Sequence, residues 1–191
     1  MYKAIEKENI KAIEYLIKNG EDINDNTRGL SNLEFALIKN KIKSAQFFID
    51  NGVNIEGDVG RTALKYGVLP LRIDIVKFLI KNKINLNYQD ENGDTILHYI
   101  AKGSIDKNLE NLQKYADESE HVKKFPDGHA KMQKSIDVIK SRWENYPKVI
   151  ELLLDNGIKI DLKNNDGKTA YMLAKENNVS IALTVLKNYN N

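Results

Sequence analysis

Apolar and polar positions along this chain follow a pattern that recurs about every 33 residues. In each copy, an apolar run with helical spacing leads into an Asn-Gly pair, and a short stretch of alternating apolar and polar residues follows. The pairs end at Gly20, Gly52 and Gly157, and a fourth copy carries Lys83 in the glycine position. Each glycine predicts a left-handed residue that ends a helix. Lys83 in that conformation should cost about 1 kcal/mol.

A second marker, a glycine two residues before a serine or threonine, opens four of the copies. The pairs are Gly29/Ser31, Gly60/Thr62, Gly93/Thr95 and Gly167/Thr169. We expect the glycine to supply a positive φ or a close backbone approach at a turn, and the hydroxyl to cap the following helix. The hydroxyl residues are 31, 33 and 74 positions apart; the last interval exceeds a 33-residue period by 41, so the fourth copy contains an insertion. A single helical pair cannot bury its own apolar face, so neighbouring copies must stack.

Residues 90–98, Asp-Glu-Asn-Gly-Asp-Thr-Ile-Leu-His, resemble the signature of the ankyrin repeat family, and weaker copies begin at Asn26, Gly57 and Asn164. The chain departs from that signature in three ways: Ile96, Ala63 and Ala170 replace a proline, only His98 keeps the histidine, and Leu71 replaces an inner-turn glycine. The resemblance implies an all-α repeat solenoid of helix-turn-helix units with short β-turn fingers. It implies one domain over 1–191, with units at about 1–24, 25–56, 57–89, 90–163 and 164–191.

The insertion, residues 103–146, has the pattern of an antiparallel helical hairpin. Two apolar series, each spaced 4, 3, 4, run from Ile105 to Ala116 and from Met132 to Trp143. Phe125-Pro126-Asp127-Gly128-His129 lies between them and predicts the turn. The segment has eight basic and eight acidic residues, which argues against a nucleic-acid-binding arm. Two alternatives remain: the hairpin packs on the repeats, or it projects and binds a partner.

Composition excludes several classes of function. The formal net charge of +2 gives no reason to expect nucleic acid or a membrane as partner, and the absence of cysteine excludes thiolate zinc sites and a cysteine nucleophile. No apolar run reaches the ~20 residues of a membrane span, and no signal peptide is visible, so a cytoplasmic location is expected, or delivery into a host cell if the protein is an effector.

Candidate chemistry is equally sparse. His98 occupies the family's structural position, while His121 and His129 are eight residues apart without further ligands. No phosphate loop, nucleophile elbow or triad pattern is present. We therefore predict no enzyme activity, no metal and no cofactor.

The resemblance implies a protein–protein interaction module, in which loops and inner helices bind a partner protein that is thereby inhibited or scaffolded. An adaptor, an effector and an immunity protein all fit, and a monomer is expected. The alternative is an architectural protein whose hairpin mediates a homodimer. The predicted contact residues lie at the turn tips and the hairpin tip: Thr27, Arg28, Asp58, Val59, Arg61, Tyr88, Glu91, Asn92, Asp94, Phe125, His129, Asn165, Asp166 and Lys168.

Overall fold

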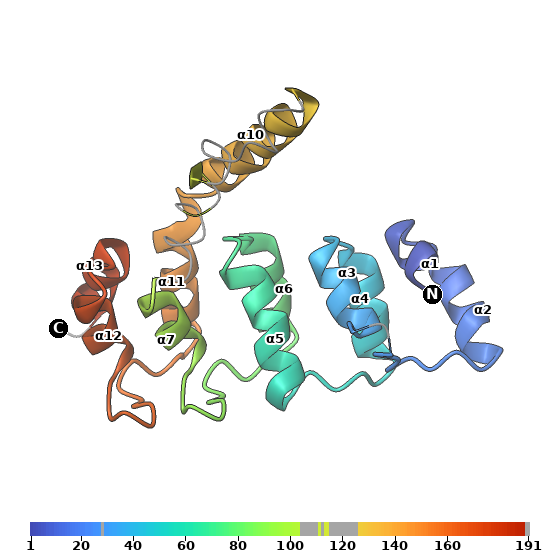
Figure 1. Ribbon diagram of the computed structural model, residues 1–191. Coiled ribbons are helices and arrows are strands. Elements are labelled where there is room, and N and C mark those ends of the chain that lie inside the picture. The colour runs from blue at the N-terminus through green and yellow to red at the C-terminus, as the bar shows by residue number, and fades with distance from the viewer. Residues whose placement is uncertain (28, 104–110, 112, 115–125, 190–191) are drawn as a thin grey trace. The chain divides into compact units, whose positions relative to one another are not determined.

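The protein is an all-α repeat fold, as predicted. The computed structural model describes residues 1–27, 29–103, 111, 113–114 and 126–189. Those residues form helices joined by short turns, without a β-strand, and include one isolated antiparallel bridge between Lys163 and Thr169 (Figure 1). The chain divides into two compact bodies: body 1 is Met1–Gly67 with Asp74–Asn85, and body 2 is Val68–Ile73 with Leu86–Asn191.

Body 1 is built from stacked helical pairs. Its helices are α1 (Tyr2–Glu6), α2 (Ile10–Lys18), α3 (Asn32–Ile38), α4 (Ile42–Asp50), α5 (Gly57–Val68, which reaches the edge of the body) and α6 (Ile73–Lys81). α1 packs on α2 and on α3, and α3 packs on α4. The fully buried apolar side chains of α1 to α4 include Ile5, Ile13, Leu33 and Phe48. Each helical pair therefore buries its apolar face against the next one, as the repeated pattern requires.

Body 2 follows the same plan around the inserted segment. Its helices are α7 (Ile96–Ala101), α10 (Pro126–Ser141), α11 (Asn145–Asp155), α12 (Ala170–Glu176) and α13 (Ser180–Tyr189). α12 packs on α7 and α13, and α13 also packs on α11. Tyr146, Ile150 and Leu153 of α11 are fully buried. Pro147 lies in the first turn of α11, where its missing N–H costs no hydrogen bond, as predicted.

The predicted left-handed helix ends are confirmed. Gly20, Gly52 and Gly157 have φ angles of 96°, 87° and 88°, and Lys83 adopts the same region with φ of 58°. Leu71, the predicted departure at an inner turn, keeps the turn with φ of 55° while its side chain is 1% exposed. Burial of the leucine offsets the strain of its backbone conformation. Lys83 is exposed and has no such compensation.

Replacing Lys83 with glycine is therefore expected to raise the free energy of unfolding by about 1 kcal/mol, because glycine adopts positive φ without steric cost. Lys77→Gly is the matched control, since Lys77 is also exposed but lies inside α6, where glycine costs about 1 kcal/mol. Urea denaturation followed by circular dichroism measures both changes. Destabilisation by both variants would contradict the backbone assignment at Lys83.

The inserted segment differs from the prediction at its turn. α10 begins at Pro126, so residues 126–129 form the first turn of a helix and not a connecting turn. Proline favours the first helical turn as readily as a β-turn, and Asp127 interacts favourably with the helix dipole there. Phe125, His121 and the apolar series from Ile105 to Ala116 lie outside the described residues.

The described part of the second apolar series packs inward. Ile136 is fully buried, and Trp143, in the turn between α10 and α11, contacts Tyr146 edge to face with ring centroids 5.5 Å apart. Lys140 Nζ donates to Gln113 Oε1 at 2.9 Å, so one described residue of the first half lies beside α10. No helix in the described ranges is long and apolar enough to cross a membrane.

Candidate partner-binding surface

We call the first helix of each pair (α1, α3, α5, α7 and α12) the inner helix and the second the outer helix. Short turns, here called fingers, precede α3, α7 and α12: residues 26–30, of which Arg28 lies outside the described residues, 90–94 and 164–168. In the second finger one side chain organises the turn. Asp90 Oδ1 accepts the backbone N–H groups of Asn92 and Asp94, both at 2.9 Å, and the Asp90 carbonyl accepts the N–H of Gly93 at 2.8 Å. Tyr99 Oη donates to Asp90 Oδ2 at 2.5 Å. The finger thus forms an Asx turn whose geometry depends on the residue five positions before the helix-capping hydroxyl.

The third finger repeats this arrangement with an amide. Asn164 Oδ1 accepts the N–H groups of Asp166 and Lys168 at 3.1 and 3.0 Å, and the Asn164 carbonyl accepts from Gly167 at 2.9 Å. Gly167 has φ of 73°, as the corresponding Gly93 has φ of 72°. Asn26 holds the same position in the first finger, where its carbonyl accepts the N–H of Gly29 at 2.9 Å.

Asp90→Ala is expected to lower the free energy of unfolding by about 1–3 kcal/mol, because two N–H groups of the finger lose their acceptor. Asp90→Asn is the control: asparagine retains the acceptor oxygen and does this task at position 164. Asp90→Asn should lower the free energy of unfolding by less than half as much as Asp90→Ala. Thermal unfolding of the three proteins measures the difference, and equal losses would show that the Asx turn is not the source of the effect.

Neighbouring fingers in body 2 dock through hydrogen bonds. Asn165 N–H donates to the Asn92 carbonyl at 2.9 Å, and Asn165 Nδ2 donates to the Glu91 carbonyl at 2.9 Å. Asn164 Nδ2 donates to Asp94 Oδ1 at 3.0 Å. The fit is close, since a Cβ on Gly93 would lie 2.8 Å from the backbone nitrogen of Asn165.

The buried His98 adds to this docking, in the structural role expected for it. Its Nδ1 accepts the N–H of Thr95 at 3.1 Å, so the ring hydrogen is on Nε2, which lies 3.0 Å from the Lys168 carbonyl and donates to it. His98 therefore ties α7 to the next finger.

Body 1 departs from this pattern at the third repeat, and two predictions are corrected there. Gly57 occupies the position of Asp90 and Asn164, has no side chain to form an Asx turn, and α5 begins at this residue. Gly60 and Thr62 consequently lie inside α5, so Gly60 does not form a turn and Thr62 does not cap a helix start. The predicted close approach does hold, because a Cβ on Gly60 would lie 1.9 Å from the carbonyl oxygen of Ile55.

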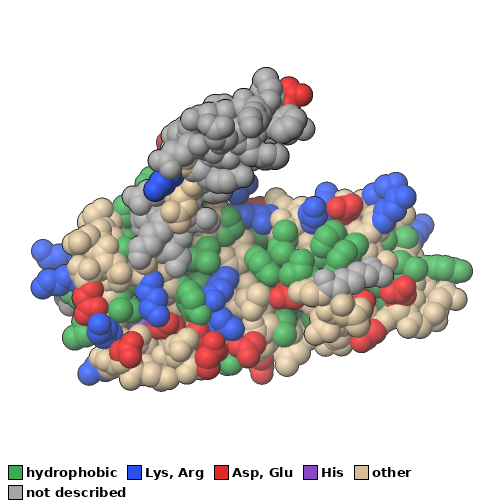
Figure 2. Space-filling view, viewed as in Figure 1, with side chains coloured by type: hydrophobic (Ala, Val, Ile, Leu, Met, Phe, Trp, Pro, Cys, Tyr) green, Lys and Arg blue, Asp and Glu red, His purple; other side chains and the backbone are tan. Residues whose placement is uncertain are grey.

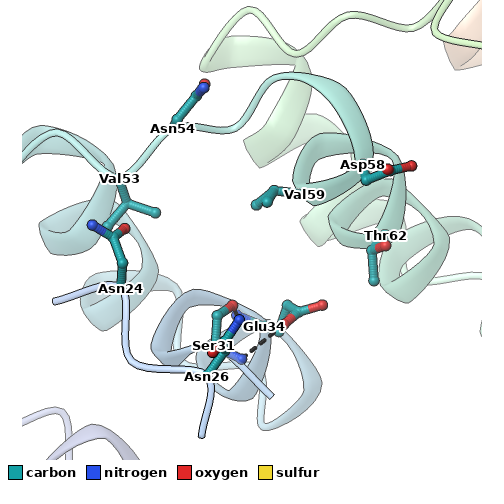
Figure 3. Close-up of a pocket in the computed structure, with 9 residues that line it drawn as sticks. All are labelled: Asn24, Asn26, Ser31, Glu34, Val53, Asn54, Asp58, Val59 and Thr62. Carbon is teal, nitrogen blue, oxygen red and sulfur yellow. Dashed lines mark hydrogen bonds between the residues drawn. The ribbon is translucent and has the colours of Figure 1, made fainter. Parts of the chain in front are cut away.

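An open groove of about 410 Å³ lies where the finger is missing. It is lined by Asn24, Asn26, Ser31, Glu34, Val53, Asn54, Asp58, Val59 and Thr62 (Figure 3). Val53 and Val59 point into the groove from opposite sides, among amide and hydroxyl groups. Two carboxylates lie on its wall: Glu34 Oε2 accepts the N–H of Ser31 at 2.8 Å, and Asp58 pairs with Arg61 at 3.0 Å.

Aromatic side chains lie along the inner helices of body 1, beside this groove. Tyr2 stacks on Phe35 with ring centroids 3.9 Å apart, and the Lys39 ammonium lies 5.6 Å from the Phe35 centroid. On α5, burial and the negative charge of Glu34 raise the pKa of the Tyr66 hydroxyl. Tyr2, Phe35 and Tyr66 are each half-buried, and hydrophobic side chains gather over α3 and α5 in Figure 2. We call these three residues the inner aromatic face.

Comparison with known proteins identifies the repeat. A family model described as ankyrin repeats matches residues 1–90 in three copies. A putative ankyrin repeat protein of Acanthamoeba polyphaga mimivirus is 31% identical over 103 residues, which are 52% of this chain and 14% of the viral protein. Residues 1–90 are therefore similar to ankyrin repeats.

Two further relatives align over most of the chain. Alpha-latrotoxin-Lg1a of Latrodectus geometricus is 25% identical over 177 residues, 90% of this chain and 10% of the toxin. The nuclear factor NF-kappa-B p105 subunit of Gallus gallus is 28% identical over 167 residues, 85% of this chain and 16% of the subunit. The chain thus spans 10% to 16% of the lengths of these three relatives.

The contact residues predicted from the ankyrin resemblance fall into three groups. The exposed group is Thr27, Asp58, Val59, Glu91, Asn92, Asn165 and Asp166. Half-buried residues are Arg61, Tyr88 and Lys168, the last of which pairs with Glu176 at 2.7 Å. Arg28 and Phe125 lie outside the described residues, as does the side chain of His129.

Asp94 is a correction to the predicted contact set. It is 1% exposed, accepts from Asn164 and forms an ion pair with Lys102. Because it supports the docking of two fingers, we remove it from the contact residues. The structure adds the inner aromatic face, which the sequence analysis missed. The signal was present in the alignment of the copies, since Phe35 and Tyr66 each follow the marker hydroxyl by four residues.

Proposed function

We propose that this chain binds another protein, and that body 1 provides the contact through its inner aromatic face and the groove beside it. Ankyrin repeats are generally protein–protein interaction modules, which supports the class of function. The observation that carries the location is the row of half-buried aromatic side chains on α1, α3 and α5. Aromatic residues are enriched in protein interfaces because they bury large apolar areas at low entropic cost.

The mechanism we propose is occupancy: the bound chain inhibits or scaffolds its partner, and no covalent step is involved. The surface offers no concentrated charge. Glu34 and Asp58 are accompanied by Lys39 and Arg61 nearby. Such a mixed surface favours a specific protein partner over nucleic acid or an anionic membrane.

Affinity capture with single-residue variants tests this proposal. Tyr66→Arg places a charge on the inner aromatic face and should reduce the amount of captured partner at least tenfold. Tyr15→Arg is the matched control, because Tyr15 is 66% exposed on the outer helix α2. Equal capture by both variants would contradict the assigned surface.

A third protein, with residues 104–144 replaced by a short turn, tests the inserted segment; the replacement stops before α11 begins at Asn145. Undiminished capture would show that the insertion does not bind the partner.

Self-association is the second candidate, because α10 exposes Val138, which is 41% accessible. An exposed apolar residue on a helix outside the main core fits a contact with a second copy. Light scattering separates the two candidates: the mass of a monomer at every protein concentration excludes the homodimer.

A further inference from the structure

We infer that the groove of body 1 accepts a β-turn of the partner protein, an Asx-containing turn with a basic side chain, in the place of the missing finger. This inference rests on the proposed function and specifies the chemistry of the segment that the groove recognises. Its basis is a comparison within the chain: body 2 docks one finger on another, whereas body 1 has a groove at the corresponding place.

Body 2 shows how a turn binds to a finger. The turn at 164–168 contributes one backbone N–H and one side-chain amide, both from Asn165, to two carbonyl groups of the preceding finger. It also contributes the Lys168 carbonyl, which accepts from His98. A few hydrogen bonds from one tight turn are thus sufficient to cover the edge of a finger.

Body 1 lacks the second turn for a reason that can be traced to one residue. With Gly57 in place of an Asx residue, the chain enters α5 directly, and the first finger faces a groove instead of another turn. Asn24 and Asn26 come from the loop and finger before α3, whereas Asp58 and Thr62 come from α5 (Figure 3). These side chains provide both donors and acceptors to a backbone turn. The volume of about 410 Å³ falls in the range of pre-formed ligand sites.

Charge specifies the occupant further. Two of the described lining residues are acidic, Glu34 and Asp58. Asp58 forms an ion pair with Arg61 at 3.0 Å, so Glu34 supplies most of the negative charge of the groove. The finger that docks in body 2, taken with one flanking residue at each end as Lys163–Thr169, carries two lysines and one aspartate, a net charge of +1. A turn with a positive net charge complements the negative charge of the groove. Val53 and Val59, which point into the groove, can pack against the methylene groups of a lysine side chain.

The test uses a synthetic peptide with the sequence of residues 163–169, cyclised by a disulfide between two added cysteines. The chain has no cysteine, so the peptide disulfide cannot exchange with it. Backbone amide chemical shifts of the full chain are recorded during titration. We expect saturable shifts at Asn24, Asn26, Asn54 and Thr62. A cyclic peptide of the same composition in scrambled order should bind at least tenfold more weakly.

Two variants give the matched comparison. Val59 and Met172 are exposed apolar residues, 39% and 48% accessible, on inner helices of body 1 and body 2. Val59→Arg should weaken peptide binding at least tenfold, because it fills the groove and repels the lysines, whereas Met172→Arg should leave binding unchanged. No saturable shift at the groove, equal binding of the scrambled peptide, or full binding by Val59→Arg would each overturn the inference.

Partner capture separates this inference from the proposed function. If Tyr66→Arg loses the partner and Val59→Arg captures it fully, the inner aromatic face stands and the groove assignment is wrong. If both variants capture the partner at the level of the unmodified chain, the assignment of the inner aromatic face and the assignment of the groove are both wrong.

Discussion

Leu153→Ala is expected to lower the free energy of unfolding of body 2 by about 2–5 kcal/mol. Leu153 is fully buried in α11, so its removal forfeits apolar burial and leaves a cavity among rigid neighbours. Trp143 is the single tryptophan of the chain and packs on Tyr146 of α11, so its fluorescence reports on this body during urea denaturation. Leu154→Ala is the control, because Leu154 is only half-buried and should cost less than half as much. Full tolerance of Leu153→Ala would contradict the packing of α11.

Gly60→Ala should destabilise body 1 by about 3 kcal/mol, at the upper end of the cost of overpacking a core. The direction of the change in the free energy of unfolding is the informative part of this result. In an unconstrained helix interior, glycine to alanine is worth about 1 kcal/mol in favour of alanine. Here the new Cβ would lie 1.9 Å from the carbonyl oxygen of Ile55, a backbone atom that cannot rotate away.

Gly67→Ala is the control in the same helix. Its Cβ would lie 3.0 Å from side-chain carbons of Ile75 and Val76 and 3.2 Å from the backbone nitrogen of Val76, contacts that are much less severe than the one at Gly60. The helix preference of alanine offsets most of that contact, so we expect a change within about 1 kcal/mol. Circular dichroism during chemical denaturation measures both variants. Stabilisation by Gly60→Ala would show that the start of α5 is assigned wrongly.

The helix ends could be predicted from the sequence because they depend on a single local requirement. A left-handed residue after a helix favours glycine strongly enough to mark Gly20, Gly52 and Gly157. Lys83 was recognised as the same position because its neighbours repeat the pattern. The all-α fold follows from the same local signals repeated at a fixed spacing.

The absence of a finger from the third repeat could not be predicted, because the marker pair of glycine and hydroxyl residue is not sufficient to form one. Gly60 and Thr62 have the same spacing as Gly93 and Thr95, yet they lie within a helix. The deciding residue stands five positions before the hydroxyl, and Gly57 cannot accept the two N–H groups that hold the other turns. The marker pair is the same in the copies with and without a finger. The importance of the residue five positions earlier becomes clear only from the hydrogen bonds that Asp90 accepts.

The candidate surface was partly predictable. Asp58 and Val59 are exposed, as predicted contact residues should be, but they lie in the first turn of α5 and not in the turn where the sequence analysis placed them. The burial of Asp94 was missed because it depends on Asn164, which is 70 residues away in sequence. The stacking of Tyr2 on Phe35 likewise joins two separate repeats.

The most direct test of the central claim, recognition of a protein by body 1, is amide hydrogen exchange of the full chain with and without its captured partner. We expect slower exchange on binding in residues 24–27, 29–35 and 57–66, and unchanged exchange in the outer helices α2 and α4. Protection confined to α2 and α4, or to α10, would contradict it.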